Sequence, residues 1–312
     1  MFNKIKQHIT TSDIYTLFML FFYTLLAIIF CNKIENCFGI LFLNFFLINS
    51  ILLVTYLQDS LGNNKTYIYF RSLYMIPIVF IIYSQVQIYI PFLNNNLYDN
   101  VLAEWDRFLF GVNPTEYLHQ FSNPILTEYF QFSYMSYYIS PVILGIELLN
   151  RDTKKYYNFM LRSILFSFYL SYLFYFLMPA IGPRFIIHDF FKLSNELPGL
   201  FLTEFFRNIV NIGGGIPSNA INPQDFVNRD CMPSGHTWIS IILIFTAFKT
   251  NSKFRYLILV LGISLIIATV YLRYHYVVDV IAGIILAFFS IKFEPILNNL
   301  VNNKINLLKK SN

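Results

Sequence analysis

The chain has 312 residues, of which 56% are hydrophobic, 19% are aromatic and only 12% are charged, with a formal net charge of +5. An average soluble domain has about 25% charged residues. This composition therefore excludes a soluble globule, a disordered chain and a disulfide scaffold, and it predicts a polytopic membrane protein. The 22 Lys and Arg residues form no basic stripe, which argues against nucleic acid as a partner. The three cysteines show no metal or redox spacing, and we assign them no role.

Eight segments of the chain are apolar enough to predict membrane-spanning helices, which need about 20 residues each and fewer where the span is short. They lie at 14–31, 38–57, 72–91, 128–149, 159–178, 236–249, 255–272 and 275–292. No small-residue cleavage site follows the first segment, so we interpret it as a span and not as a signal peptide. The expected fold class is an all-α, multi-pass integral membrane protein with about eight transmembrane helices.

The distribution of positive charge predicts the orientation of these spans. With both termini in the cytoplasm, 14 of the 22 Lys and Arg residues lie inside, 7 lie outside and Arg162 lies within a span. Because cytoplasmic loops carry an excess of Lys and Arg, this is the favoured orientation. The membrane expected is a bacterial inner membrane or a plasma membrane, and the long loop described next then faces the non-cytoplasmic side.

The loop from residue 179 to residue 235 is the longest connection between predicted spans, and it holds 6 of the 12 Pro and 6 of the 12 Gly residues. Loops of this length are functional or disordered. Its apolar stretch at 197–207 does not suit disorder and predicts a helix lying at the membrane surface. A second interfacial segment is predicted at 101–111, where charged and aromatic residues are mixed.

Two short polar motifs stand out from the apolar background. The first, Asp-Cys-Met-Pro-Ser-Gly-His-Thr at 230–237, precedes and begins the sixth span, and the second, Arg-Tyr-His-Tyr-Val-Val-Asp at 273–279, joins the last two spans. Ser234 and Gly235 lie at a predicted helix start, where free N–H groups attract an anion, and His236 follows them. His275 and Asp279 are four residues apart and share a helix face, so the carboxylate can orient the imidazole as a base or nucleophile.

Two arginines are candidates for holding phosphate oxygens through their planar guanidinium groups, namely Arg184 and Arg273. The competing interpretation of Arg184 is an interfacial cation. A histidine at a membrane boundary is usually structural, but an ionisable residue inside a span, as Asp279 is, indicates function. Other polar residues receive structural interpretations: His8, His119 and His188 as structural histidines, Arg207 and Arg229 as solvated loop charges, and Glu128 and Glu147 as interfacial caps.

The motif Pro-Ser-Gly-His-Thr at 233–237, followed by His-Tyr-x-x-Asp at 275–279, resembles the type 2 phosphatidic acid phosphatase superfamily, relatives of vanadium haloperoxidases, over residues 100–292. The segments 106–111 and 182–184 resemble the branch that contains inositol phosphorylceramide synthases, and His-Tyr-x-x-Asp also resembles sphingomyelin synthases. The resemblance implies that His275 attacks phosphorus and becomes phosphohistidine, that Asp279 orients it, and that His236 protonates the leaving alkoxide. It implies no metal and no cofactor.

The chain departs from the family pattern at the phosphate-binding motifs. The Lys-x6-Arg-Pro motif is absent, because Leu177 stands in the place of the Lys and Phe185 follows Arg184. Thr269 occupies the position of an Arg that the phosphatases carry six residues before the histidine. The resemblance therefore supports the family's reaction chemistry for this chain more strongly than it supports the family's phosphate-binding residues or its substrate.

These observations predict a metal-independent membrane enzyme with a lipid phosphate as substrate. The expected domains are a two-helix extension at 1–60, a six-helix phosphatase-type core at 61–292 with its active-site loop at 179–235, and a cytoplasmic tail at 293–312. The leading function is hydrolysis of a lipid phosphate monoester at the non-cytoplasmic face. The alternative is transfer of a phospho-alcohol head group to a lipid alcohol acceptor. Outside the enzyme class, a proton-coupled transporter or flippase would need two related halves, which are not visible.

Overall fold

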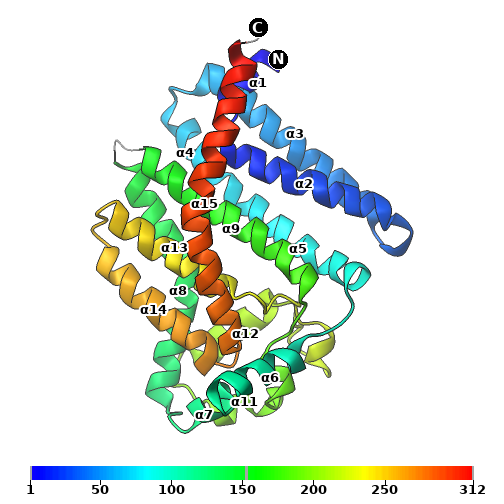
Figure 1. The fold of residues 1–312 in the computed structure, drawn as a ribbon, viewed down its shortest axis with the longest axis vertical. Coiled ribbons are helices and arrows are strands. Elements are labelled where there is room, and N and C mark those ends of the chain that lie inside the picture. Colours follow the sequence, from blue (N-terminus) through cyan, green and yellow to red (C-terminus); the bar gives the residue numbers. More distant parts are fainter. Residues whose placement is uncertain (1, 152–153, 311–312) are drawn as a thin grey trace. The chain divides into compact units, whose positions relative to one another are not determined.

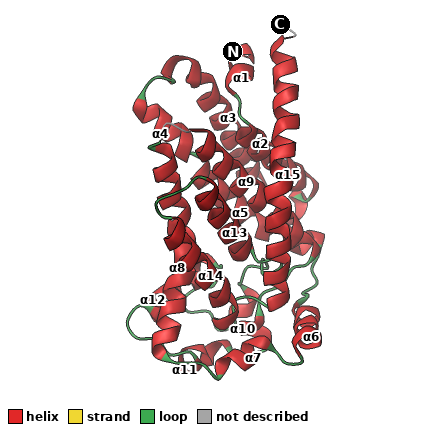
Figure 2. Cartoon of the chain, turned by 60° about the vertical axis from the view of Figure 1, so that its left-hand side comes forward, coloured by secondary structure: helices red, strands yellow, loops and turns green. Residues whose placement is uncertain are grey.

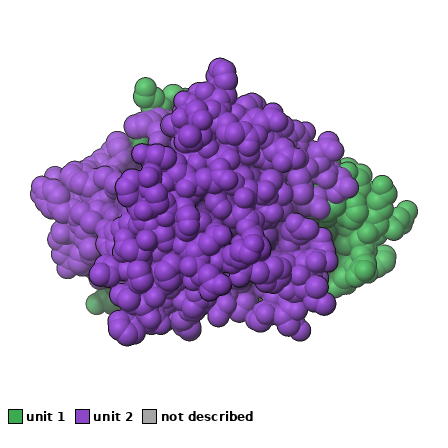
Figure 3. All heavy atoms as spheres, turned by 90° about the horizontal axis from the view of Figure 1, so that it is seen from below, with its two compact units in different colours: residues 1–93, 291–312 green, residues 94–290 purple. Residues whose placement is uncertain are grey.

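The computed structural model describes residues 2–151 and 154–310, so the last two residues of the expected tail lie outside the described residues. Within these ranges the regular structure is helical, with no strand (Figure 2). The chain divides into two compact units, residues 1–93 with 291–312 and residues 94–290 (Figure 3). The all-α prediction is confirmed. The units divide at residue 93, whereas the domain boundary expected from the sequence lies at residue 60 and stays a prediction.

The first unit contains the N-terminal helices together with the end of the last helix. Its elements are α1 (Phe2–His8), α2 (Thr11–Ile29), η1 (Cys31–Lys33), α3 (Cys37–Leu61), α4 (Lys65–Leu73), α5 (Met75–Leu93) and residues 291–310 of α15 (Val277–Lys310). Lys309 donates a hydrogen bond to the Gln7 carbonyl at 2.8 Å, so the described chain ends lie side by side (Figure 1). The predicted tail therefore continues the last helix, and Thr11 binds it through Asn298 at 2.7 Å.

A disulfide joins Cys31 to Cys37 in the connection between α2 and α3. Leaving all three cysteines without a role is therefore wrong for this pair, and only Cys231 is a free thiol in the described part of the chain. The pairing escapes sequence reasoning because two cysteines six residues apart match no metal or redox motif. Disulfides persist in oxidising compartments, and the predicted orientation places this connection outside the cytoplasm.

The second unit contains the two motifs. Its elements are α6 (Asp99–Phe110), α7 (Pro114–His119), α8 (Pro124–Leu149), α9 (Lys154–Leu177), α10 (Pro183–Ile186), η2 (Phe190–Lys192), α11 (Leu193–Glu196), α12 (Thr203–Gly213), η3 (Pro223–Asp225), α13 (Gly235–Lys249), α14 (Arg255–Tyr271) and the first part of α15. Helix α8 packs against α9, α13 and α14, and α12 packs against α8. The short helices α6, α7, α11 and α12 gather at one end of this unit (Figures 1 and 2).

Six helical stretches in the described residues are long and apolar enough to cross a membrane, and α13 and α14 are shorter apolar helices. These eight elements correspond to the eight predicted spans. The integral membrane class is therefore confirmed. The third stretch, Lys65–Leu93, combines α4 and α5, so it begins before the predicted residue 72.

Both predicted interfacial segments form helices, although one of them is displaced. Helix α6 overlaps the prediction at 101–111, and Gly111 caps its end with a φ of 74°, which suits a glycine at that position. Helix α12 begins at Thr203 and not at 197, since the Pro198-Gly199 pair precedes it. Their location at the membrane surface stays a prediction.

Candidate active site

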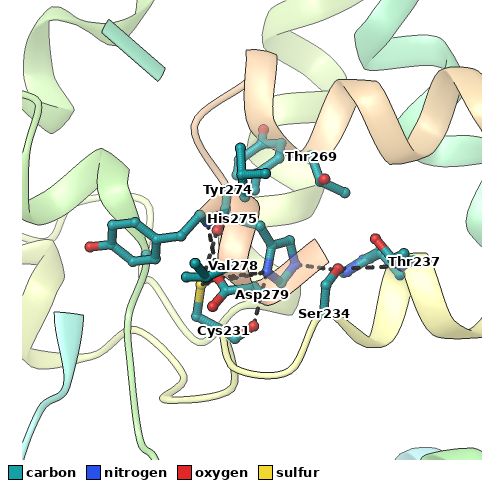
Figure 4. Close-up of polar contacts among 12 residues, drawn as sticks. Cys231, Ser234, Thr237, Thr269, Tyr274, His275, Val278 and Asp279 are labelled. Atoms are coloured by element: carbon teal, nitrogen blue, oxygen red, sulfur yellow. Dashed lines mark hydrogen bonds and ion pairs between the residues drawn. The ribbon is translucent and has the colours of Figure 1, made fainter. Parts of the chain in front are cut away.

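The structure brings the two motif histidines together. Nε2 of His275 lies 3.3 Å from Nδ1 of His236, although the two residues are 39 positions apart. His275 is buried in the turn between α14 and α15, and His236 lies in the first turn of α13. The close-up in Figure 4 shows the His275 imidazole between Cys231 and Asp279 on one side and the start of α13 on the other.

The protonation of His275 follows from its partners. Its Nδ1 lies 2.9 Å from the main-chain carbonyl oxygen of Cys231 and 3.5 Å from Oδ2 of Asp279. Both oxygens accept hydrogen bonds, so Nδ1 carries the proton and donates. Nε2 therefore keeps its lone pair and points toward His236. This is the arrangement of an oriented nucleophile, in which the protein holds one ring nitrogen and leaves the other free to react.

Asp279 is fully buried, and its carboxylate is held by the chain around it. Oδ2 accepts the Tyr276 amide at 2.9 Å and the Cys231 thiol at 2.8 Å, whereas Oδ1 has no hydrogen-bond partner among the described residues. Burial raises the pKa of the Cys231 thiol well above its ordinary value, so the thiol stays protonated and donates. Cys231 was missed by sequence reasoning, because a lone cysteine carries no spacing signal.

The His236 imidazole packs against two aromatic rings of α8. The Tyr134 ring is 4.6 Å from the imidazole centroid and stacked on it, and the Tyr137 ring is 4.4 Å away. Packing against both rings limits the rotation of the imidazole, whose Nδ1 lies toward His275. These tyrosines come from a different span and were not among the predicted site residues.

Ser234 and Gly235 form the helix start that the sequence predicts. The Ser234 hydroxyl accepts the Thr237 amide at 3.3 Å and caps α13, and the Ser234 amide donates to the Asp279 carbonyl at 3.1 Å. A Cβ at Gly235 would meet the Tyr175 hydroxyl at 3.0 Å, so a side chain there would crowd α9. The cap and the close approach keep the beginning of α13 against the beginning of α15.

Two carboxylates of α6 hold the backbone around the site, and sequence reasoning assigned them no role. Asp106 accepts the amides of Val277 and Val278, each at 2.9 Å, and so caps α15. Asp99 accepts the amides of Ile181 and Gly182 and the Tyr276 hydroxyl. Burial raises the pKa of both carboxyls, and the amide donors oppose that shift. Asp106 lies in the predicted interfacial segment 101–111 and Asp99 lies just before it, but the distant partners of both carboxylates leave no signal in the sequence.

Arg184 is buried, and the rings of Phe185, Phe190 and Tyr274 lie 4.8, 5.7 and 4.9 Å from its guanidinium carbon. Nη1 donates to Oδ1 of Asn211 on α12 at 2.8 Å, and the Arg184 amide donates to the Arg273 carbonyl at 3.1 Å. Burial lowers the pKa of this guanidinium, although arginine stays charged at neutral pH. The residue is thus a desolvated cation attached to the segment that precedes His275.

Arg273 is also buried, but its side chain is occupied by a different group of residues. It forms an ion pair with Glu196, and Nη2 lies 3.3 Å from Nδ1 of His119. Its φ of 65° places this backbone in the left-handed region. The ion pair lowers the pKa of the Glu196 carboxyl. Nη1 of Arg273 can therefore contact phosphate only after it leaves Glu196, whereas Nε has no hydrogen-bond partner among the described residues.

Several residues outside the motifs are less isolated than their sequence interpretations suggest. The solvated interpretation of Arg207 is wrong, since Arg207 is buried and donates to Ser194 and to the Leu197 carbonyl, each at 3.0 Å. His188 lies 2.9 Å from the Thr115 hydroxyl, and burial lowers its pKa to about 4. Glu128 does not cap its own helix, α8. It accepts the amides of residues 200–203, which precede and begin α12.

Among the described residues, one group offers three side-chain atoms that could ligate a metal ion. Cys231, His275 and Asp279 each contribute one such atom, and these atoms lie within 4.8 Å of one another. The same atoms form the hydrogen bonds that orient the imidazole. The expected absence of a catalytic metal stays a prediction.

The fold and site define a helical membrane protein with a pair of facing histidines. A family profile described as the PAP2 superfamily matches residues 100–293, more than half of the chain, so the chain belongs to this superfamily. That match coincides with the unit at 94–290, which contains the site. The resemblance inferred from the motifs is confirmed at the level of the superfamily.

The chain is also similar to a PA-phosphatase related-family protein of Dictyostelium discoideum. The two are 26% identical over 191 residues, which cover 55% of this chain and 33% of the relative. The chain thus spans 33% of the length of the curated relative that it matches. Comparison with solved structures found no significant match.

Proposed function

We propose that this chain hydrolyses a lipid phosphate monoester through a covalent intermediate on His275, without a metal ion. The observation that carries the proposal is the contact between Nε2 of His275 and Nδ1 of His236 at 3.3 Å, with Nδ1 of His275 already held by Cys231 and Asp279. Membership of the PAP2 superfamily supports the same class of reaction. A substrate phosphoryl group would replace the direct contact between the two rings.

In the first step, Nε2 of His275 attacks phosphorus. A phosphorus–nitrogen bond forms, and the bond between phosphorus and the lipid oxygen breaks. His236, protonated at that point, donates its proton to the departing lipid alkoxide, so the lipid leaves as an alcohol. Asp279 and the Cys231 carbonyl stabilise the proton that stays on Nδ1 of His275 while the ring gains positive charge.

In the second step, water attacks the phosphohistidine. His236, now neutral, takes a proton from the water as the new oxygen–phosphorus bond forms. The phosphorus–nitrogen bond breaks, which releases inorganic phosphate and restores His275. In both steps Arg184, Arg273 and the Gly235 amide at the start of α13 stabilise the negative charge on the phosphoryl oxygens.

A second candidate is transfer of a phospho-alcohol head group to a lipid alcohol, in which an acceptor hydroxyl replaces water in the second step. The specific observation in its favour is the departure at the phosphate clamp, since Leu177 and Thr269 stand where phosphatases carry cations. A transporter or flippase is the third alternative, and it predicts lipid movement without cleavage of a phosphorus–oxygen bond.

One assay separates these alternatives. Purified protein in bilayer nanodiscs is given a panel of lipid phosphates, with and without a lipid alcohol, and inorganic phosphate and new phospholipid are measured together. Hydrolysis releases phosphate from a monoester, whereas transfer yields a new phospholipid only when the alcohol is present. His8, in α1, provides a matched control because its ion-pair partner is Asp59 of α3, which belongs to the first unit. Equal activity in His275→Ala and His8→Ala would overturn the proposal.

We further propose that the site faces the non-cytoplasmic side. The excess of inner Lys and Arg residues supports this orientation, and so does the Cys31–Cys37 disulfide in a connection expected outside. Asn222 is exposed in the active-site loop. In a cysteine-free background, Asn222→Cys should react with an impermeant thiol reagent in intact cells. Reaction only after permeabilisation would invert the orientation.

A further inference from the structure

Helix α12 has two unlike faces. Phe205, Ile209 and Ile212 follow one another at helical spacing and are exposed, while Arg207 and Val210 are buried. Just before the helix, residues 200–202 add three further exposed apolar side chains, among them Phe201 with 88% of its surface free. This is the pattern of a helix that lies in the plane of a membrane surface.

The inner side of α12 is attached to the end of a candidate span. Glu128 is in the second turn of α8, and its carboxylate accepts four consecutive amides from Leu200 to Thr203 and the Thr203 hydroxyl. Two of these amides, those of Leu202 and Thr203, belong to the start of α12, which leaves them without partners inside the helix. Because α8 is itself long and apolar enough to cross a membrane, this attachment places α12 level with the beginning of a span.

The same helix carries the residue that holds the buried arginine. Asn211 accepts a hydrogen bond from Nη1 of Arg184 at 2.8 Å, and a Cβ on Gly214 would lie 3.8 Å from Nη2. Arg207 anchors the helix inward through Ser194 and the Leu197 carbonyl. One rigid helix therefore presents an apolar face outward and positions a site cation inward.

We propose that α12 lies in the head-group layer of the bilayer, with Phe205, Ile209 and Ile212 toward the lipid, and that it positions Arg184 through Asn211 for a phosphate in that layer. The partner is a phospholipid surface. The assignment of Arg184 to phosphate rests on the proposed function, whereas the location of α12 does not. Asn211 is thus a positioning residue that connects the membrane-facing helix to the phosphate clamp.

The location of α12 is tested without any activity measurement. Ile212→Cys is labelled with an environment-sensitive fluorophore in the otherwise native protein, whose Cys31 and Cys37 are paired and whose Cys231 is buried. The protein is reconstituted in phosphatidylcholine vesicles. Lipids brominated on the upper acyl chain should quench the probe, and aqueous iodide should quench it weakly. Strong quenching by iodide alone, or protection from both quenchers by a protein partner, would overturn the proposal.

The coupling is tested with two substrates, a long-chain lipid phosphate in the bilayer and a short-chain, water-soluble analogue. Phe205→Ser with Ile212→Ser should raise KM about tenfold for the bilayer substrate, as the loss of buried apolar area predicts, and should change kcat/KM for the soluble analogue less than twofold. Asn211→Ala should lower kcat/KM for both substrates, since Arg184 loses its anchor. The exposed polar residue Asn208 provides the matched control, Asn208→Ala.

Equal losses on both substrates in the double variant would show a purely structural role for the apolar face and would overturn the proposal. Wild-type rates for Asn211→Ala on both substrates would overturn the coupling. A wild-type protein that releases no phosphate from either substrate would overturn the proposed function and the coupling together, while the quenching experiment would still report the location of α12.

Discussion

The carboxylate of Asp106 lies 2.9 Å from the amide nitrogen of Val277, across 171 positions of sequence. Through this contact α6 caps the start of α15, the helix that carries Asp279 and begins two residues after His275. Asp106→Ala leaves two amides without partners, which we expect to lower the free energy of unfolding by about 2 kcal/mol and to lower kcat more than it changes KM. Chemical denaturation in detergent and initial rates measure both. Glu104→Ala, at an exposed residue of the same helix, should change neither.

Substitution of two buried residues, His275 and Asp279, should separate chemistry from folding. His275→Ala should abolish turnover, because it removes the imidazole that Cys231 and Asp279 orient for attack on phosphorus. Asp279→Asn should retain the fold and reduce kcat by about 10⁴-fold, as when an orienting carboxylate is removed elsewhere. Steady-state rates and the thermal unfolding temperature test this pair. A near wild-type rate for His275→Ala would contradict the mechanism.

Arg184 and Arg273 should both contribute to kcat/KM, and the ion pair with Glu196 should limit the contribution of Arg273. Arg184→Ala and Arg273→Ala should each lower kcat/KM by about 10²-fold, comparable with the loss of one transition-state donor. If Arg273 leaves Glu196 to bind phosphate, Glu196→Gln should keep kcat/KM or raise it, because the guanidinium is released. A loss in Glu196→Gln equal to that in Arg273→Ala would instead assign the ion pair to structure. Arg229→Ala is the control and should change kcat/KM little.

Phosphate release should survive excess chelator, because the site offers no carboxylate cluster that suits Mg²⁺. Vanadate should inhibit competitively by occupying the phosphate position between the two histidines. Rates with and without chelator, followed by addition of single divalent ions, test this prediction. Loss of activity in chelator and recovery with one ion would assign a metal to the group of Cys231, His275 and Asp279.

His188 should make the folded protein less stable in mild acid. Burial lowers its pKa from 6.5 to about 4, so between these values the unfolded chain binds a proton that the folded chain does not. Stability from this residue is therefore present above pH 6.5 and is lost as pH falls toward 4, by at most about 1.4 kcal/mol per pH unit. Unfolding temperatures at pH 7 and pH 4.5 measure the loss. His188→Asn should reduce this loss of stability. An equal loss in the variant would show that His188 does not cause it.

Local pattern was sufficient for the class of protein and for the core of the site. Apolar runs predict the spans because the thickness of a bilayer imposes their length on the sequence. The four-residue spacing of His275 and Asp279, and the helix start at Ser234 and Gly235, are geometric consequences of neighbouring positions. Sequence reasoning could therefore select these residues, and their catalytic roles stay predictions.

Tertiary structure alone decided which distant groups complete the site. The Cys231 carbonyl at Nδ1 of His275, the Asp106 cap on α15 and the Asn211 contact to Arg184 join residues whose separation leaves no periodic signal. The same reason explains why Arg207 was wrongly predicted to be solvated. A charge in a loop is interpreted as solvated until its distant partners are known. Spacing along the chain determines which neighbours share a helix face, whereas a contact between remote segments exists only when packing brings them together.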